Sequence, residues 1–570
     1  MIDTATLREE VEGWLAQDPD AETHAELSSL RAAGDWEALA ERFSGRLQFG
    51  TAGLRAELGG GPMRMNRLVV RQAAAGLVAY VAERAPRGRR PLLVVGYDAR
   101  RRSDVFAADT AAVAAARGVE VRVLEGPLPT PVLAFAVRHL GADAGVMVTA
   151  SHNPPRDNGY KVYLGDGAQI VPPHDERIAA EIARAGRAPV EVLDDPWSSP
   201  LVATVGGELV DAYLEAIVAQ SVRPRARAVA VAFTALHGVG AETMLAAFRR
   251  AGFAPPVVVE DQSRPDPAFP GLPFPNPEEP GVLDRLLDVA EGAGAQVALA
   301  NDPDADRLGV AVPGPGGWRV LTGDEVGALL ADHLLRHTSG DDRLVVSTVA
   351  CSRLVERMSE AAGVRAARTL TGFKWIVRPA LEHPEWRFLF GYEEALGYCV
   401  GPVVRDKDGI SAALLVAEVV ADLAGAGSSP AERLAELAGE HGLHATAQWS
   451  VRFGDRASGM AGTSALMARL RVDPPGALAG VAVDRVCDLA KGLDGLAPSD
   501  VLVWELGDGS RLVVRPSGTE PKLKVYAEVV RLVPPEAAGG HEEAEREARA
   551  RLGELRDALR PLLATGGGRL

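Results

Sequence analysis

The sequence reads AGVMVTASHNPP at residues 144–155, and this stretch decides how the first part of the chain folds. Residues 144–148 are apolar and have the length of a buried strand. The three residues that follow Ser151 and His152, Asn-Pro-Pro, prevent the chain from continuing as a strand or a helix. Ser151 is therefore expected on a rigid bend at the end of a strand, where a hydroxyl is well placed for covalent chemistry.

Strands and helices alternate around this stretch. We predict strands at residues 92–97, 119–124 and 160–164, with helices at 104–117 and 131–140. The same rhythm recurs over residues 229–300 and 322–390, and it is typical of sheets covered by helices. Residues 449–530 differ, because they combine alternating strands with one helix before a charged C-terminal helix. The predicted fold class is α/β: three similar mixed α/β domains and a C-terminal α+β domain.

A chain of 570 residues is too long for one core. We place an N-terminal helical extension at residues 1–45 and expect it to be a cap or a dimer contact without chemistry. Three α/β domains are predicted at residues 46–205, 206–320 and 321–445, and the α+β domain at residues 446–570. Each domain contains one loop whose residues suggest chemistry.

Composition excludes several classes of partner. The chain has 61 basic and 77 acidic residues and a net charge of −16, so neither nucleic acid nor an anionic membrane is an expected partner. The three cysteines lie far apart without a CxxC spacing, which fits a reducing compartment and gives no zinc signature. No apolar run approaches the roughly 18 residues of a membrane helix, and no signal peptide is evident. We expect a cytoplasmic protein.

The loop NDPDADR at residues 301–307 follows a predicted buried strand. Its alternate residues Asp302, Asp304 and Asp306 would point three carboxylates to one side, which suits a hard divalent cation. An EF-hand is excluded, because Arg307 and Pro313 stand where that motif needs Gly and Glu. Ligands that are all oxygen favour Mg²⁺ over zinc.

The loop GYEEALGY at residues 391–398 contains Glu393 and Glu394. Adjacent carboxylates can accept hydrogen bonds from sugar hydroxyls, although such a pair can also belong to a plain surface turn. The charged segment RDKDG at residues 405–409 opens a helix, and capping by Asp408 is an alternative explanation for its charges.

The loop RPSGTEPK at residues 515–522 lies between two alternating strands. It combines an arginine, two hydroxyls and a glycine that lets backbone N–H groups approach a ligand, which suits a phosphate clamp. Its candidate residues are Arg515, Ser517, Gly518 and Thr519. Together the four loops indicate phosphoryl transfer on a small-molecule sugar phosphate.

With these residues the chain resembles the α-D-phosphohexomutase superfamily from about Phe49 to its end. It is similar in particular to the longer phosphoglucomutase and phosphopentomutase branch, through QFGTAGLR at residues 48–55, LTGFKW at 370–375 and VRDKDG at 404–409. The resemblance implies four domains around a central cleft, each contributing one loop. It also implies that Ser151 is phosphorylated and joins the three aspartates in holding Mg²⁺.

The resemblance assigns roles to the remaining candidates. Lys161 corresponds to a general acid/base, and Arg55 and Arg307 line the cleft. His152 is counted with the catalytic residues, but it need not act as a base, because Mg²⁺ and Lys161 offer the activation. A phosphoserine brings about −1.5 to −2 charges beside three aspartates, so these cations are needed as counter-charges. The substrate would be held by Glu393, Glu394, Thr371, Gly372 and Lys407 at the sugar and by Arg515, Ser517, Gly518 and Thr519 at the phosphate that is not transferred.

The implied activity is a mutase that moves phosphate between C1 and C6 of a hexose phosphate, with glucose as first choice. It proceeds through the phosphoserine and a sugar 1,6-bisphosphate, which is both intermediate and activator. Phosphomannomutase and phosphopentomutase, acting on C1 and C5 of ribose or deoxyribose phosphate, are the alternatives. The rivals from other classes are a sugar-bisphosphate synthase, a Mg²⁺-dependent sugar phosphatase and a non-catalytic sugar-phosphate sensor.

One position departs from the family pattern. Ala395 stands where the family usually carries a Ser or Thr that contacts the sugar, which leaves the sugar open. The choice between a monomer and a homodimer is open as well.

Overall fold

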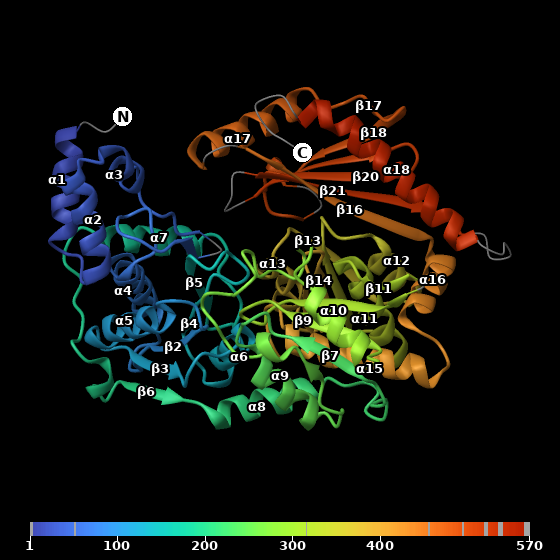
Figure 1. Ribbon diagram of the computed structural model, residues 1–570, viewed down its shortest axis with the longest axis horizontal. Helices are drawn as coiled ribbons and strands as arrows, with labels where there is room; N and C mark the ends of the chain where they lie inside the picture. Colours follow the sequence, from blue (N-terminus) through green and yellow to red (C-terminus); the bar gives the residue numbers. More distant parts are fainter. Residues whose placement is uncertain are drawn as a thin grey trace. The chain divides into compact units, whose positions relative to one another are not determined.

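The computed structural model describes residues 4–50, 53–314, 316–453, 456–492, 495–517, 522–533 and 540–563. The chain divides into two compact units. Figure 1 shows the helices and strands, coloured along the sequence. The first comprises Met1–Leu321 and Leu396–Ala421, and the second comprises Thr322–Ala395 and Asp422–Leu570. The first unit therefore recruits a segment from late in the sequence.

The first sheet of the first unit has six strands in the order β1-β5-β4-β2-β3-β6. Strand β2 runs parallel to β3 and β4, whereas β5 runs antiparallel to β4 and β1, so the sheet is mixed. All five residues of β4 are buried, which explains its unbroken apolar run. The strands are β1 Leu54–Glu57, β2 Leu92–Tyr97, β3 Glu120–Leu124, β4 Ala144–Val148, β5 Asp157–Leu164 and β6 Val202–Val205. The helices are α4 Arg67–Arg84, α5 Ser103–Ala116, α6 Thr130–His139 and α7 His174–Ala185, and the 3₁₀ turn η1 is Pro196–Ser198.

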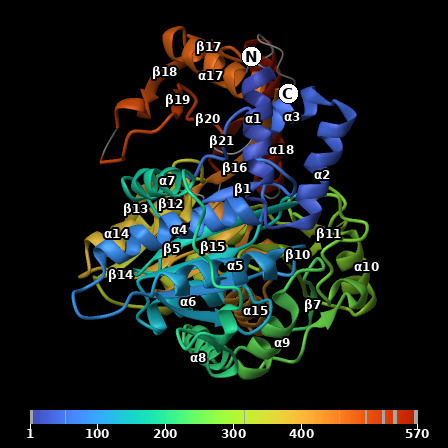
Figure 2. The same cartoon turned by 90° about the vertical axis from the view of Figure 1, so that its left-hand side faces the viewer.

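Three helices precede this sheet: α1 Thr4–Leu15, α2 Ala21–Ala33 and α3 Trp36–Arg42. Figure 2 shows them as one group, in dark blue. Leu27 and Leu39 are fully buried and belong to the same hydrophobic core as Val70 and Val95 of the first sheet domain. The N-terminal helices thus pack on that domain.

The second sheet of the first unit has five strands in the order β11-β10-β9-β7-β8. The strands are β7 Val231–Thr234, β8 Val257–Val258, β9 Val297–Asn301, β10 Leu308–Gly314 and β11 Gly317–Val320. The helices are α8 Gly207–Val218, α9 Gly240–Arg250 and α10 Asp284–Gly292, with the 3₁₀ turn η2 Glu260–Gln262. Strand β15 Gly397–Val400 also lies in this unit, as does the greater part of helix α15 Gly409–Gly425.

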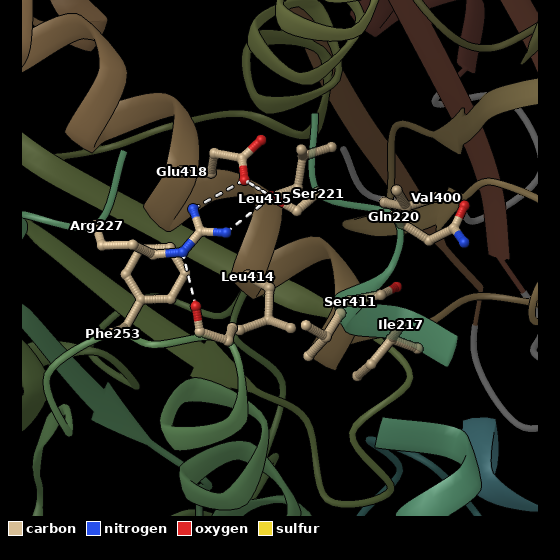
Figure 3. Close-up of a pocket in the computed structure, with 12 residues that line it drawn as sticks. Ile217, Gln220, Ser221, Arg227, Phe253, Val400, Ser411, Leu414, Leu415 and Glu418 are labelled. Carbon is tan, nitrogen blue, oxygen red and sulfur yellow. Dashed lines mark hydrogen bonds and ion pairs between the residues drawn. The ribbon is translucent and has the colours of Figure 1, made fainter. Parts of the chain in front are cut away.

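A buried carboxylate joins α15 to the segment after α8 (Figure 3). Glu418 accepts hydrogen bonds from the Ser221 hydroxyl, from the backbone N–H groups of Val222 and Arg223 at 3.0 and 2.8 Å, and from Arg227 at 2.9 Å. The space beside these residues is about 20 Å³. This space has room for no more than a water molecule. We therefore interpret the Glu418 contact as a structural link between α15 and the segment after α8, and the space beside it is not interpreted as a ligand site.

In the second unit, β12 lies between β13 and β14 and runs parallel to both. The last sheet is antiparallel throughout and follows the order β16-β21-β20-β19-β18-β17. The strands are β12 Arg343–Thr348, β13 Arg365–Thr369, β14 Arg387–Glu393, β16 Leu443–Arg452, β17 Ala477–Leu478, β18 Val481–Asp488, β19 Leu502–Leu506, β20 Arg511–Pro516 and β21 Lys522–Arg531. The helices are α11 Gly323–His337, α12 Leu354–Ala361, α13 Phe373–Ile376, α14 Arg378–Glu382, α16 Pro430–His441, α17 Arg456–Val472 and α18 Gly540–Leu563, with the 3₁₀ turn η3 Leu489–Lys491.

The predicted fold class is confirmed: three mixed α/β domains precede a C-terminal domain built on an antiparallel sheet. Among the described residues no single helix is both long enough and apolar enough to span a membrane. Helices α15 and α16 reach such a length and hydropathy only together, across a bend of 86°.

Candidate active site

Ser151 sits directly beyond β4 with a φ of 53°, in the left-handed region that non-glycine residues rarely adopt. Its side chain is buried, and its Oγ donates a hydrogen bond to Asp302 Oδ2 at 2.8 Å. Its backbone N–H donates to Thr149 Oγ1 at 2.8 Å. Such backbone strain costs about 1–3 kcal/mol and is concentrated at functional sites. The expected rigid bend is present, and it aims the hydroxyl at the aspartate loop.

Arg100, which the sequence did not suggest, holds this bend in shape. Its guanidinium donates to the carbonyl oxygens of Ser151 and Asn153, both at 2.6 Å, and to those of Pro154 and Asp157 at 2.8 and 3.1 Å. Burial lowers the pKa of Arg100, and the adjacent Asp98 carboxylate, 3.4 Å away, opposes that shift. One planar side chain therefore donates to four backbone oxygens of this turn, of which that of Pro154 also accepts from the Asp157 backbone N–H.

The aspartate loop gathers three fully buried carboxylates. Asp302, Asp304 and Asp306 each offer an oxygen, and these oxygens lie within 4.8 Å of one another. Neither Asp304 Oδ1 nor Asp306 Oδ1 accepts a hydrogen bond from any described residue, although both are buried. Buried carboxylate oxygens without donors are costly unless a cation meets them. The donor set is all oxygen, so these residues fit Mg²⁺.

The three carboxyl groups do not titrate alike. Burial, with the negative charges of Asp304 and Asp306, raises the pKa of Asp302 well above its usual value. Burial acts in the same direction on Asp306, but the cations of Lys161 and Lys407 outweigh it and lower the pKa of that carboxyl. Lys161 also lowers the pKa of Asp304, so the cations of this site act on Asp304 and Asp306 more than on Asp302.

Lys161 projects from β5 into the aspartate loop. Its Nζ lies 2.6 Å from Asp304 Oδ2 and 2.8 Å from Asp306 Oδ2. Burial alone would lower the pKa of Lys161, but these two carboxylates raise it above the ordinary value. The side chain is thus held as an ammonium. Thr130, at the start of α6, also donates to Asp304 Oδ2 at 2.6 Å, a contact that sequence reasoning missed.

Lys407 also lies at the aspartate loop, although the sequence analysis predicted that it binds the sugar of the substrate. Its Nζ is 3.2 Å from Asp306 Oδ2 and 3.1 Å from Asp406 Oδ1. Asp406 in turn accepts hydrogen bonds from Tyr163 and Gln169, both at 2.7 Å. The sugar contact of Lys407 stays a prediction, and the structure adds a role beside the aspartates.

Asp408 caps helix α15. Its Oδ1 accepts hydrogen bonds from the backbone N–H groups of Ile410 and Ser411, at 3.0 and 3.1 Å. Tyr213 donates to the same oxygen at 2.9 Å. Capping, the alternative explanation for this part of the charged segment, is what the structure shows for Asp408.

The other candidates of the first unit surround the serine. Arg55 donates to Asn153 Oδ1 at 3.2 Å, and burial lowers its pKa against the pull of Asp304. The Arg307 backbone N–H donates to Asp302 Oδ1 at 3.0 Å, and its Nε lies 4.0 Å from Asp306 Oδ1. His152 Nδ1 lies 4.0 Å from Asp302 Oδ2. The structure therefore brings together every candidate that the first unit contains.

The second unit holds a separate polar cluster. Glu394 Oε2 lies 3.5 Å from Thr348 Oγ1 and 3.9 Å from Cys351 Sγ. Burial raises the pKa of Tyr526, and the negative charge of Glu394 adds to that effect. Arg515 donates a hydrogen bond to the Tyr526 hydroxyl at 3.4 Å. Glu394 and Arg515 thus share the Tyr526 neighbourhood, a grouping that the sequence separates by more than a hundred residues.

The remaining candidates of the second unit have simpler surroundings. Glu393, Thr371, Gly372 and Ser517 are half-buried. Gly372 has a φ of 107°, a conformation that requires glycine, and the Ser517 backbone N–H donates to the Lys522 carbonyl at 2.8 Å. Gly518 and Thr519 lie outside the described residues.

Four sequence signatures of the phosphoglucomutase/phosphomannomutase family match this chain. They are α/β/α domain I at residues 46–188, domain II at 211–316, domain III at 322–441 and the C-terminal domain at 467–532. The chain belongs to this family, within the α-D-phosphohexomutase superfamily, as the sequence motifs indicated. The exact domain boundaries given above stay predictions.

Similar proteins share most of their length with this chain. A probable phosphomannomutase of Haemophilus influenzae is 43% identical, covering 81% of this chain and 93% of the relative. The human phosphopentomutase is 35% identical and covers 92% of both chains. The crystal structure of a putative phosphomannomutase from Thermus thermophilus superposes with a TM-score of 0.68 at 28% identity, covering 90% of this chain and 99% of the other.

These comparisons define the class of enzyme. The protein is a phosphosugar mutase, an isomerase that transfers phosphate within a substrate, and its family depends on Mg²⁺. Its relatives include a phosphomannomutase and phosphopentomutases, so they support the alternative sugars better than the first choice of glucose.

Proposed function

We propose that this protein is a phosphopentomutase, which interconverts the 1-phosphate and the 5-phosphate of ribose or deoxyribose. One observation carries the choice of sugar: the human phosphopentomutase and a probable phosphoribomutase of Schizosaccharomyces pombe align over 92% and 91% of this chain. Ala395 supports it, because a sugar with one carbinol fewer needs fewer hydroxyl contacts. Mannose is the second candidate, since the bacterial phosphomannomutase has the higher identity, 43%.

The proposed nucleophile and phosphate carrier is Ser151. Asp302 receives the hydrogen bond of its hydroxyl and so orients Oγ within the bend. When the serine takes phosphate from a sugar bisphosphate, the bond between phosphorus and the sugar oxygen breaks and a bond to Oγ forms, while the Oγ proton passes to Asp302, which accepts its hydrogen bond. Lys161, held as an ammonium, has a proton on Nζ that the departing sugar oxygen can take.

Asp302, Asp304 and Asp306 are the proposed Mg²⁺ ligands, with the phosphate of Ser151 as a further one. Bound there, Mg²⁺ would neutralise charge and polarise the phosphoryl group as a Lewis acid. Lys161, Lys407, Arg307 and Arg55 supply the rest of the positive charge that a phosphoserine beside three aspartates requires.

In the second unit we propose a substrate-binding role for the cluster around Tyr526. Glu393 and Glu394 would accept hydrogen bonds from sugar hydroxyls, with Thr371 and Gly372 in the neighbouring loop. Arg515, Ser517, Gly518 and Thr519 would hold the phosphate that is not being transferred. The half-buried position of Arg515 beside a buried tyrosine supports this assignment, because it fixes the guanidinium.

The choice of sugar is tested by turnover of ribose, mannose and glucose 1-phosphates, each with and without its sugar bisphosphate. We expect kcat/KM for ribose 1-phosphate to exceed the others by at least about 10-fold, which corresponds to about 1.4 kcal/mol. A tenfold preference for a hexose phosphate would contradict the pentose assignment. Inorganic phosphate release that outpaces isomer formation would instead indicate a phosphatase.

The role of Ser151 is tested with Ser151→Ala. Turnover should fall by more than about 10³-fold, because no other step replaces the covalent carrier. Mass spectrometry after incubation with sugar bisphosphate should show one added phosphate on the unmodified protein and none on the variant. Ser198→Ala is the matched control, since that exposed hydroxyl donates to the Asp195 carbonyl of its own turn.

A further inference from the structure

A second group of metal-ligating side chains lies in the second unit, apart from the aspartate loop. His333 and His337 are four residues apart on α11, so they lie on one face of that helix. Asp422, near the end of α15, faces them: its Oδ2 is 3.2 Å from His337 Nε2 and 3.9 Å from His333 Nδ1. The three ligand atoms all lie within 4.8 Å of one another.

These separations are close to those of a metal centre. Tetrahedral Zn²⁺ with bonds of about 2.0–2.1 Å places its ligand atoms roughly 3.4 Å apart. The 3.2 Å contact already meets that value, and the 3.9 Å contact exceeds it by little. The imidazole rings have their centroids 4.7 Å apart at an interplanar angle of 70°, so they are not stacked face to face. The two histidine nitrogens lie within 4.8 Å of each other, so side-chain rotations are needed to bring all three atoms onto one ion.

The electrostatics of this place favour a cation. Helix α11 ends at His337 and helix α15 at Gly425, so two helix C-termini with partial negative charge lie near the cluster. Asp422 lies in the last turn of α15, where a carboxylate opposes the helix dipole. A positive charge at Asp422 offsets both effects. Protonation of one histidine would also offset the negative charge of the helix C-termini and of Asp422. The experiment must therefore distinguish a bound ion from a protonated histidine.

The donor set differs in kind from that of the aspartate loop. Two imidazole nitrogens and one carboxylate select transition ions such as Zn²⁺ over Mg²⁺ or Ca²⁺. The side chains of His337 and Asp422 are 21% and 15% exposed, while that of His333 is 1% exposed. One side of the cluster is therefore open to solvent, which gives an ion a path in and leaves room for a water ligand.

We propose that His333, His337 and Asp422 form a Zn²⁺ site that ties the C-terminal end of α11 to that of α15. The site is independent of the proposed mutase chemistry, because it shares no residue with the serine, aspartate or phosphate loops. Its expected contribution is structural: an ion that binds only the folded state stabilises that state by RT ln(1 + c/Kd), where c is the concentration of free Zn²⁺.

The test uses the full-length protein, stripped with a chelator and then held in excess Mg²⁺ so that oxygen-only sites are filled. Zn²⁺ titration by calorimetry should show one further equivalent, together with a higher melting temperature. Co²⁺ in place of Zn²⁺ should give the visible absorption bands of a four-coordinate site. His337→Gln and Asp422→Asn should each weaken the Zn²⁺ affinity by more than about 10-fold. Both keep polar side chains at partly exposed positions, unlike a change at buried His333.

Two controls make the result decisive. His383→Gln removes an exposed histidine that contacts Glu385 outside the cluster, and it should leave Zn²⁺ binding unchanged. Asp302→Asn alters the aspartate loop, and it should also leave the Zn²⁺ equivalent in place. Zn²⁺ binding that survives His337→Gln and Asp422→Asn, or that disappears with Asp302→Asn, would overturn the proposal. Absence of any further equivalent in the unmodified protein would overturn it too.

Discussion

At the scale of single residues, the serine loop owes its shape to Arg100. The Asn-Pro-Pro sequence after Ser151 stops the strand, but it leaves carbonyl oxygens that need donors. Arg100 supplies donors to four of them from a position 51 residues before Ser151. The geometry that aims Ser151 at Asp302 is therefore fixed by an arginine outside the loop.

Arg100→Lys should separate this positioning role from stability. Lysine keeps the charge beside Asp98 but lacks the planar fork, so it leaves some of the four carbonyls unpaired, at about 1–3 kcal/mol each. We expect kcat to fall by at least about 10-fold while KM changes little, because substrate contacts are intact. Steady-state kinetics and the rate of phosphate uptake by Ser151 from sugar bisphosphate would measure this.

The control for that variant is Arg101→Lys, at an exposed neighbour whose guanidinium pairs with Glu22. It should have nearly unchanged kcat. If Arg100→Lys lowers the melting temperature but leaves the phosphate uptake rate intact, the guanidinium is a structural support only.

The site residues that could be predicted from the sequence are marked by spacing within one loop, whereas those that were missed are marked only by partners far away in the sequence. Ser151 and the three aspartates could be predicted, because their chemistry lies in local spacing within single loops. Arg100 sits in the run DARRRS at residues 98–103, which looks like a solvated charge cluster. Its function depends on pairings across 51 residues, and the Thr130 contact with Asp304 spans 174. Only the folded chain shows such partners.

At the scale of elements, the start of α11 contains an unusual carboxyl group. Thr322 and Glu325 form a capping box there, and Asp324 Oδ1 accepts hydrogen bonds from the Ser352 backbone N–H at 2.7 Å and the Tyr392 hydroxyl at 3.0 Å. Burial raises the pKa of Asp324 to about 7, and the charges of Glu394 and Glu528 add to the effect. Asp324 is thus a buried acid that ionises near neutral pH.

Asp324→Asn should stabilise the protein at alkaline pH. The carboxyl has a pKa of about 7 in the folded state and 3.8 as its ordinary value, so the folded state holds more protons between these values. Stability must therefore fall as the pH rises from about 4 to about 7, by up to about 4 kcal/mol. Asparagine keeps the accepting oxygen and cannot ionise, so the gain should be largest above pH 7 and vanish near pH 4. Denaturant midpoints at pH 4.5, 6 and 8 would measure it.

Asp341→Asn, at an exposed aspartate four residues beyond α11, is the matched control for a change of net charge. It should show no comparable dependence on pH. An Asp324→Asn variant that is less stable than the unmodified protein at pH 8 would mean that the carboxylate is held by compensating donors, and the argument would fail.

Elements were predictable where one face or one short run is apolar. The predicted strand at residues 92–97 coincides with β2, and helix α6 begins one residue before the predicted start. Helix α4 was missed because most of its length is buried, from Leu68 to Val81, so it has no polar face to mark a helical period. Helix α15 is apolar in the same way, and the sequence pointed only to its charged start.

At the scale of the whole molecule, the assembly of the first unit has no local signature. The segment Leu396–Ala421 follows most of a second-unit domain in sequence, yet it folds with Met1–Leu321. Lys407 meets Asp306, and Glu418 meets the segment after α8, only because of this return. Counting α/β repeats along the sequence predicts the number of sheets but cannot assign such a segment to its unit.

The N-terminal helices could be an integral part of the first domain or only a dimer contact, and deletion of residues 1–45 should distinguish the two. Leu27 is fully buried against Gly60, where an added Cβ would lie 2.6 Å from Leu27 Cγ, and Leu39 is fully buried in the same core. Glu26 accepts a hydrogen bond from the Gly60 backbone N–H at 2.7 Å. Glu22 pairs with Arg101 and Arg102, the two residues that directly follow Arg100. We therefore expect the deletion to lower the melting temperature, expose apolar surface and slow phosphate uptake by Ser151.

The comparison variant for this deletion is Leu27→Ala, which keeps the helices and removes only core volume, at about 2–5 kcal/mol. Melting curves, dye binding and light scattering coupled to size exclusion should rank the deletion below Leu27→Ala in stability. A pure dimer contact predicts another result: a deleted chain that is smaller in solution but melts and turns over like the full chain. That outcome would contradict the packing argument, because a segment that shares the core of the first domain cannot be removed without cost to that core.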